Sequence, residues 1–155
     1  MDCDVLVIGA GMTGMMAALR LHALGQRVRL LDKGRGVGGR MATRRVGPGF
    51  ADVGAQFITA RAASFADLLA RWEEAGLIYP WAAGFAQGSL RPSADVTFYP
   101  RYAAHNGMNS LAQHLVQGLD VRTQVTVQAV RQVQDGWQVE DATGGMTLAR
   151  RVLLT

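Results

Sequence analysis

One arrangement near the start of the chain is compatible with few folds. Residues 5–8 form a continuous apolar run of strand length, and residues 9–14 read Gly-Ala-Gly-Met-Thr-Gly. Residues 12–24 are apolar at most positions and end before a glycine, which is typical of a buried helix. A second strand is expected over residues 27–31. Strand, helix and strand in this order predict a βαβ unit, and therefore an α/β fold with a parallel sheet.

The spacing of the glycines indicates a dinucleotide site. Gly9 permits a tight turn, Gly11 lets the backbone approach a pyrophosphate, and Gly14 lets helix and strand pack closely. Met12 and Thr13 open the helix, where free N–H groups and the positive dipole end favour phosphates. Because the glycines follow a strand and open a helix, they carry more weight than an isolated GxGxxG. We therefore expect a Rossmann-like FAD/NAD(P)-binding domain.

An acidic residue ends the second strand, where a nucleotide ribose is expected. Asp32 lies 21 residues after Gly11. Its carboxylate can accept hydrogen bonds from ribose hydroxyls, and its charge disfavours the 2′-phosphate of NADP. Lys33 follows directly and is also a candidate cofactor-binding residue. The pattern to this point fits either NAD or FAD.

A second glycine-rich segment follows the acidic residue. Residues 36–45 read Gly-Val-Gly-Gly-Arg-Met-Ala-Thr-Arg-Arg. The pair Gly38 and Gly39 permits a second close backbone approach, and Arg40 can fork onto phosphate oxygens. The plain alternative is a solvated basic loop. We expect residues 33–49 to form a long loop, which in a compact domain is usually functional or disordered.

The rest of the chain predicts two helices and a group of strands. A helix is expected over residues 64–75 with Ser64 as its cap, and another from Asn109, as N-cap, to residue 116. Residues 121–148 alternate as strands with turns at residues 135–136 and 143–145. The expected fold is thus a βαβ core with an added β-meander, followed by an apolar strand over residues 151–155.

These motifs together resemble the flavin-containing amine oxidoreductase superfamily, whose FAD domains carry GxGxxG, a ribose-binding acid and a GG-R-x-x-(S/T) motif. More narrowly, the chain resembles the bacterial renalase-like branch. The resemblance rests on residues 36–45, on Asp-Val-Gly-Ala-Gln-Phe-Ile-Thr-Ala-Arg at 52–61, and on residues 101–102 and 107–111. These blocks span nearly the whole chain.

The resemblance implies FAD as the cofactor and gives roles to the motif residues. The three fingerprint glycines would face the pyrophosphate, Asp32 would hold the adenosine ribose, and Gly39 and Arg40 would line the pyrophosphate and ribityl path. Gly54, Ala55 and Gln56 would lie beside the isoalloxazine. The candidate cofactor-binding residues are therefore Gly9, Gly11, Met12, Thr13, Gly14, Asp32, Lys33, Gly38, Gly39, Arg40, Gly54, Ala55, Gln56 and Val127, the last through backbone contacts to the adenine.

The chain also departs from the superfamily pattern. Many members have arginine where this chain has Gly36, and the ribose acid is aspartate where glutamate is usual. Members are about twice as long, consistent with two domains, so the chain looks like an N-terminal half. Residues 1–155 would form the FAD-binding region. Within it, residues 77–100 would make an excursion toward a substrate domain.

The resemblance implies an FAD-dependent oxidoreductase whose flavin accepts a hydride from a small reduced substrate, either a dihydronicotinamide isomer or an amine. No catalytic residue is assigned. Two alternatives remain open: an NAD-dependent dehydrogenase, and a non-catalytic dinucleotide-binding fragment of a larger flavoprotein. A fragment would leave an apolar face uncovered, and self-association through that face is expected.

Composition excludes several other classes. The net charge is +4 over 155 residues, but the arginines are scattered, so no nucleic-acid partner is expected. The single cysteine excludes a disulfide framework, and the spacings of the three histidines fit no metal site. No apolar run reaches about 18 residues, so no membrane span is expected. A strand that starts at about Asp4 leaves no room for a signal peptide, and we expect a cytoplasmic protein.

Overall fold

The computed structural model describes residues 1–83 and 99–155. These residues form two compact units. The core unit consists of Met1–Met41 and Ala112–Thr155, and the inserted unit consists of Ala42–Leu111. Most of the expected excursion over residues 77–100 lies outside the described residues.

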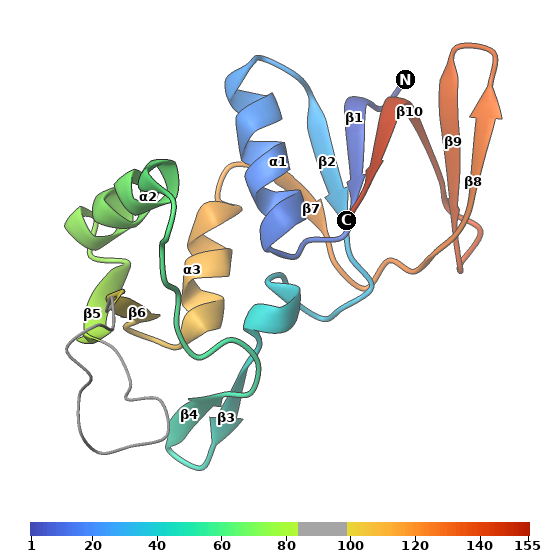
Figure 1. Ribbon diagram of the computed structural model, residues 1–155. Helices are drawn as coiled ribbons and strands as arrows, with labels where there is room; N and C mark the ends of the chain where they lie inside the picture. Colours follow the sequence, from blue (N-terminus) through green and yellow to red (C-terminus); the bar gives the residue numbers. More distant parts are fainter. Residues whose placement is uncertain (84–98) are drawn as a thin grey trace. The chain divides into compact units, whose positions relative to one another are not determined.

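The core unit contains a six-stranded sheet in the order β7-β2-β1-β10-β9-β8 (Figure 1). The strands β7, β2, β1 and β10 run parallel, and β10, β9 and β8 form an antiparallel meander. This topology confirms the predicted βαβ core with an added meander. The strands are β1 (Cys3–Ile8), β2 (Val28–Leu31), β7 (Asp120–Arg122), β8 (Val127–Val133), β9 (Gly136–Asp141) and β10 (Met146–Leu154).

Strand β10 belongs to both parts of the sheet. Its first residues, from Met146 to Ala149, pair antiparallel with β9. Later residues pair parallel with β1, where Leu154 lies opposite Ile8. The meander is therefore continuous with the parallel sheet, and β10 ends beside the turn that follows β1.

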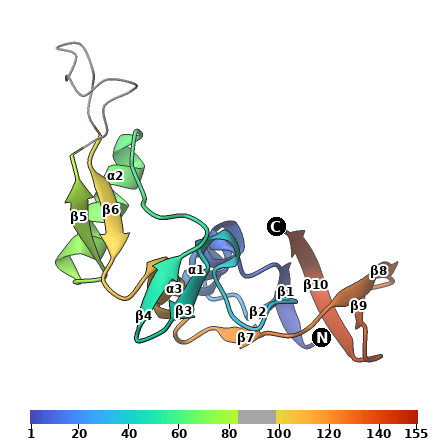
Figure 2. The same cartoon turned by 90° about the horizontal axis from the view of Figure 1, so that it is seen from below.

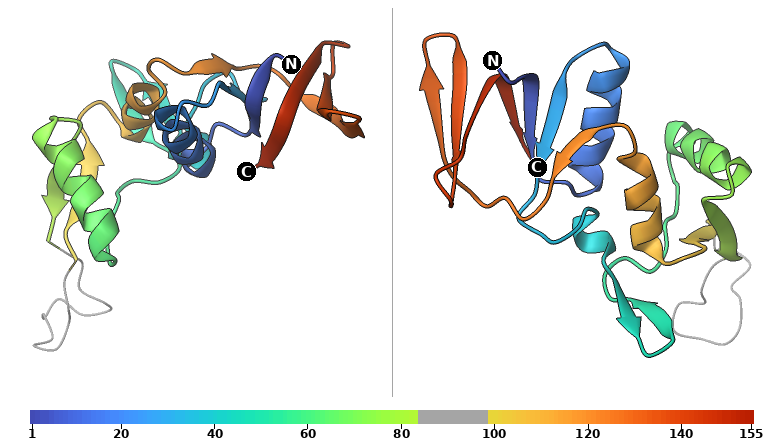
Figure 3. Two further views of the ribbon diagram at one scale, coloured as in Figure 1. Left: turned by 90° about the horizontal axis from the view of Figure 1, so that it is seen from above. Right: turned by 180° about the vertical axis from the view of Figure 1, so that it is seen from behind.

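Each face of the parallel strands has its own hydrophobic core. On one face, Val7 and Leu30 pack with Met15 from helix α1 (Met12–Ala23), and all three are fully buried. Figure 3 shows α1 running alongside β1 and β2. On the other face, Leu6 packs in a cluster that includes Val139 of the meander. Covering on both faces explains why residues 5–8 of β1 form an unbroken apolar run.

Cys3 belongs to the second of these cores. It is 2% exposed, and burial raises the pKa of its thiol. A thiol in apolar surroundings stays protonated and behaves as a small packing residue.

Among the described residues, no helix combines the length and apolarity that crossing a membrane requires.

The inserted unit contains two hairpins (Figure 2). One pairs β3 (Thr43–Val46) with β4 (Gly49–Asp52), and the other pairs β5 (Ile78–Ala82) with β6 (Arg101–Ala104). The expectation of one long loop over residues 33–49 is therefore wrong. That segment contains a short 3-10 helix (η1, Gly39–Met41) and most of the first hairpin. Both strands of this hairpin are largely exposed, so they lack the apolar alternation that usually identifies a strand.

Neither predicted helix cap is correct. Helix α2 spans Ala63–Glu74 and has Ala62 at its N-cap, without a side-chain cap, so Ser64 lies inside the helix. Helix α3 spans Met108–Leu115, which places Asn109 in its first turn. The first turn of α3 is held instead by residues far away in the sequence.

Thr43 and Asp52 cap this helix together. They are cross-strand partners in the hairpin, and the Thr43 hydroxyl donates a hydrogen bond to Asp52 Oδ1 at 2.5 Å. Asp52 Oδ1 also accepts the N–H of Met108 at 2.9 Å, and Thr43 Oγ1 accepts the N–H of Asn109 at 3.0 Å. Two N–H groups that a helix start leaves without partners are thereby satisfied. This arrangement connects three of the sequence blocks that carry the family resemblance.

Replacing Thr43 by valine should destabilise the protein by about 1–2 kcal/mol, because the cap of α3 is lost while the side-chain volume is kept. Thr43→Ser should recover most of the loss. The matched control is Thr59→Val, since the buried Thr59 hydroxyl has no hydrogen-bond partner among the described residues. Urea unfolding measures the stability of all three variants. Equal losses in Thr43→Val and Thr59→Val would contradict the capping role.

The turn between β9 and β10 depends on the charge of Asp141. Its Oδ1 accepts the Thr143 hydroxyl at 2.6 Å, the Thr143 N–H at 2.8 Å and the Gly145 N–H at 3.0 Å. These bonds, the Thr143 hydroxyl first, lower the pKa of Asp141 below its ordinary value of 3.8. A lowered pKa means that the carboxylate stabilises the fold above the ordinary pKa. That contribution disappears as the pH falls through the folded-state value.

Asp141→Asn should therefore lower the melting temperature at neutral pH, because it removes the charge but keeps one acceptor oxygen. The difference from the wild type should shrink as the pH falls below 3.8, where the wild-type carboxyl becomes protonated as well. Circular dichroism melts across this range measure the effect. A difference that does not change with pH would show that the charge is irrelevant.

Candidate dinucleotide-binding site

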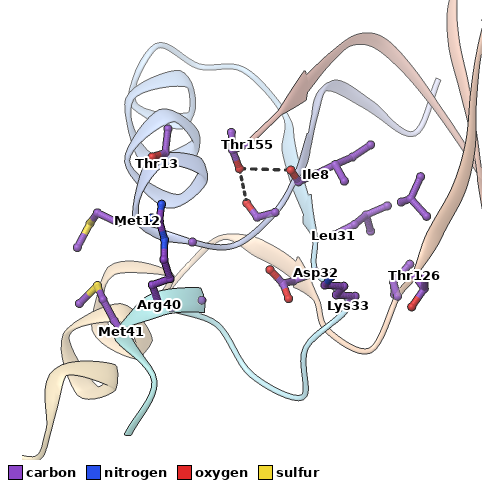
Figure 4. Close-up of a pocket in the computed structure, with 16 residues that line it drawn as sticks. Ile8, Met12, Thr13, Leu31, Asp32, Lys33, Arg40, Met41, Thr126 and Thr155 are labelled. Carbon is purple, nitrogen blue, oxygen red and sulfur yellow. Dashed lines mark hydrogen bonds between the residues drawn. The ribbon is translucent and has the colours of Figure 1, made fainter. Parts of the chain in front are cut away.

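A cavity of about 530 Å³ lies at the carboxyl ends of β1 and β2 in the core unit (Figure 4). Open α/β sheets bind ligands at this edge, and the volume is typical of a cofactor site. The residues that line it are Ile8, Gly9, Gly11, Met12, Thr13, Leu31, Asp32, Lys33, Gly38, Gly39, Arg40, Met41, Val125, Thr126, Val127 and Thr155.

The three fingerprint glycines are required for different reasons. Gly9 has a φ of +111°, and an added Cβ would lie 2.6 Å from the carbonyl oxygen of Thr155. A Cβ on Gly14 would collide with the backbone oxygen of Gly9. A Cβ on Gly11, in contrast, would have no contact within 4 Å among residues 1–83 and 99–155 beyond its own chain neighbours. Packing explains the glycines at positions 9 and 14, whereas Gly11 is not required by packing and leaves open space at the start of α1.

The start of α1 offers the cavity an anion site. Gly11 is the N-cap residue and provides no side-chain hydrogen bond, and the first turn contains no acidic residue. The first N–H groups of a helix have no partner within the helix and lie at the positive end of its dipole. Lys33 and Arg40 add positive charge to the lining, and in Figure 4 the Arg40 side chain extends toward Met12. The site is thus suited to a phosphate or pyrophosphate.

Both carboxylate oxygens of Asp32 are held by backbone groups. Oδ2 accepts the N–H of Ala10 at 2.7 Å, and Oδ1 accepts the N–H of Gly34 at 2.7 Å. A carboxylate oxygen can accept more than one hydrogen bond, so both remain able to accept from ribose hydroxyls. The sequence predicted only the ribose role. The structure adds that Asp32 connects the end of β2 to the glycine turn after β1.

The second glycine segment lies directly against the first. The N–H of Gly38 donates to the carbonyl of Ala10 at 2.8 Å, and Gly38 forms a parallel bridge with Gly11. A Cβ on Gly39 would lie 3.4 Å from the Cα of Gly11. Two close backbone approaches therefore meet at one edge of the cavity, and Arg40 follows them in η1.

The structure brings most of the predicted residues together. Those that line the cavity are Gly9, Gly11, Met12, Thr13, Asp32, Lys33, Gly38, Gly39, Arg40 and Val127. Gly14 is buried outside the cavity lining, where a Cβ would collide with the turn after β1, and its expected place facing the pyrophosphate stays a prediction. Gly54, Ala55 and Gln56 follow β4 in the inserted unit, and their place beside an isoalloxazine stays a prediction. The cofactor contacts of the lining residues also stay predictions.

The sequence reasoning missed some lining residues: Ile8, Leu31, Met41, Val125, Thr126 and Thr155. A signal was available for Ile8 and Leu31, because they end parallel strands and such ends line ligand sites. Val125 and Thr126 adjoin the predicted Val127. Thr155 follows β10, so its place in the cavity could be predicted only by knowing that β10 lies next to β1. No pattern in the sequence distinguishes Met41.

Comparison with known proteins finds a match to a dinucleotide-binding family over the first part of the chain. Residues 7–72 match the family of NAD(P)-binding Rossmann-like domains. A putrescine oxidase from Kocuria rosea is 40% identical over 74 residues, which are 48% of this chain and 15% of that protein. Wild-type putrescine oxidase bound to putrescine superposes with a TM-score of 0.76 at 15% identity, over 100% of this chain and 58% of that one.

A double mutant from a structure-based redesign of cofactor binding in putrescine oxidase gives a similar result. Its TM-score is 0.76 at 15% identity, and the match covers 99% of this chain and 57% of that one. The chain thus spans less than two thirds of the relatives' length. These findings confirm the Rossmann-like fold. They also support the resemblance to the flavin amine oxidases for the N-terminal part.

Proposed function

We propose that this chain, whose N-terminal part resembles the flavin amine oxidases, is the FAD-binding part of an FAD-dependent oxidoreductase. One observation carries the proposal: Gly11 lines the cavity at the start of α1, and no contact among the described residues requires a glycine there. A pyrophosphate can approach the backbone closely where a residue has no side chain, and it can bind the free N–H groups at an uncapped helix start.

The lining residues fit the parts of FAD. Met12 and Thr13 would present backbone N–H groups to the pyrophosphate, with Arg40 as a charged partner. Asp32 would accept the hydroxyls of the adenosine ribose, and Val127 would contact the adenine. When bound, FAD supplies the hydride acceptor, and the protein supplies binding, orientation and electrostatics. None of the lining residues is assigned as a general acid or base.

We further propose that the substrate is a small reduced compound, either an amine or a dihydronicotinamide isomer. The putrescine oxidase relative supports an amine. The Gly-Gly-Arg-Met-Ala-Thr-Arg-Arg block supports the renalase-like branch and a dihydronicotinamide. Anaerobic mixing of each compound with FAD-loaded protein tests both, because a substrate bleaches the flavin absorbance. If neither compound bleaches the flavin absorbance, the proposal that this chain acts as an enzyme is contradicted.

An NAD-dependent dehydrogenase would share the fingerprint turn and Asp32, but it has no need of the segment over residues 36–45. Competition between FAD and NAD for the cavity distinguishes the dehydrogenase from the proposed FAD-binding protein. We expect FAD to displace NAD, and Arg40→Ala to weaken FAD more than NAD. Tighter binding of NAD, unaffected by Arg40→Ala, would replace this proposal with the dehydrogenase.

Asp32→Ala should weaken FAD binding by about 1.5–3 kcal/mol, the usual loss for hydrogen bonds to a charged acceptor. The matched control is Asp135→Ala in the turn between β8 and β9, a residue that does not line the cavity. Titration of flavin fluorescence measures both variants, and urea unfolding detects any loosening of the turn. Unchanged FAD affinity in Asp32→Ala would remove this residue from the site.

A further inference from the structure

One peptide unit in the fingerprint turn is held at both of its ends. The carbonyl of Gly9 accepts the hydroxyl of Thr155 at 3.0 Å, a bond drawn in Figure 4. The N–H of Ala10, in the same peptide unit, donates to Asp32 Oδ2 at 2.7 Å. A peptide unit is planar, so fixing its oxygen and its nitrogen fixes the orientation of the whole plane.

The two partners come from different neighbours of β1. Asp32 follows β2, and Thr155 follows β10, and both strands pair parallel with β1. The backbone N–H of Thr155 donates to the carbonyl of Ile8 at 3.0 Å, which places the threonine beside the turn. Its Oγ1 also lies 3.3 Å from that carbonyl, so the two acceptors within reach of the hydroxyl, the carbonyls of Ile8 and Gly9, belong to adjacent residues.

The next peptide unit is held as well. The carbonyl of Ala10 accepts the N–H of Gly38 at 2.8 Å. The N–H of Gly11 belongs to that same plane and lies where the turn enters α1. The orientations of two successive planes therefore determine where this end of the cavity directs its backbone donors. A site whose donors are already oriented loses less free energy on binding than one that must order them.

We propose that Thr155 and Asp32 form a clamp on the Gly9–Ala10 peptide that orients the turn for a pyrophosphate. Thr155 is thus a positioning residue of the dinucleotide site, and it acts through its hydroxyl. This inference rests on the proposed function of the same cavity. It adds that Asp32 has a second role, independent of the ribose.

Calorimetric titrations with ADP and with adenosine test the clamp, because only ADP carries the pyrophosphate. Thr155→Val keeps the side-chain shape and should weaken ADP about three- to tenfold, the range for loss of one hydrogen bond. Adenosine binding should not change, and Thr155→Ser should restore ADP binding. Thr147→Val, on the same strand β10 but not lining the cavity, is the matched control and should leave both ligands unaffected.

A double-mutant cycle tests whether the two residues act together. If they hold one plane, Thr155→Val combined with Asp32→Asn should weaken ADP less than the product of the two single effects. Unchanged ADP affinity in Thr155→Val, equal weakening of ADP and adenosine, or a purely multiplicative cycle would overturn the clamp. A wild-type chain that binds ADP but not FAD would overturn the proposed function and leave the clamp intact. Absence of ADP binding to the wild type would overturn both.

Discussion

Gly11→Ala is expected to remove most of the FAD affinity while leaving the stability of the fold nearly unchanged. The backbone at this position has a φ of −76° and a ψ of 176°, which alanine adopts without strain. Apart from its chain neighbours and the local helix backbone, none of the described residues lies within 4 Å of the added methyl group. The stability loss should stay below about 1 kcal/mol, the effect of a poorer N-cap residue.

We expect Gly11→Ala to reduce the free energy of FAD binding far more than the free energy of unfolding. A methyl group at Gly11 would occupy the space through which a pyrophosphate reaches the first turn of α1. Each charge-assisted hydrogen bond lost contributes about 1.5–3 kcal/mol, so FAD should weaken at least tenfold. Fluorescence titration with FAD and urea unfolding, made on the same preparation, measure the two effects. Wild-type affinity in Gly11→Ala would show that the pyrophosphate does not approach this backbone.

Gly14→Ala should give the opposite result, with a loss of stability of about 1–3 kcal/mol or more from overpacking. Its Cβ would collide with the carbonyl oxygen of Gly9, a backbone atom that Thr155 also holds. The matched control is Gly36→Ala, because a Cβ there meets nothing within 4 Å in the part of the chain that the structure describes. Urea unfolding compares the two variants. A Gly14→Ala protein as stable as the Gly36→Ala control would contradict the close contact between α1 and the turn.

The local parts of the site could be predicted from the sequence because their partners are close along the chain. The spacing of Gly9, Gly11 and Gly14 is a property of one turn, and Asp32 follows the very next strand. The apolar run of β1 and the turn before β9 likewise indicated their elements directly. For these features, short-range rules about turns and strand ends were sufficient.

The parts that escaped prediction depend on residues distant in sequence. Thr155 bonds to a residue 146 positions away, and Thr43 bonds to one 66 positions away. The cap of α3 was assigned to Asn109 because that residue type often caps helices. The fold supplies Asp52 and Thr43 instead. The hairpin that carries them is exposed and rich in arginine, so it left no apolar pattern to detect.

The most direct test of the account is the visible absorption spectrum of the purified chain after incubation with FAD and removal of the excess. We expect a retained flavin band with one FAD per chain, lost in Gly11→Ala and kept in Gly36→Ala. A colourless protein that takes up no FAD but binds NAD would contradict the central claim, because the cavity would then serve a nicotinamide dinucleotide.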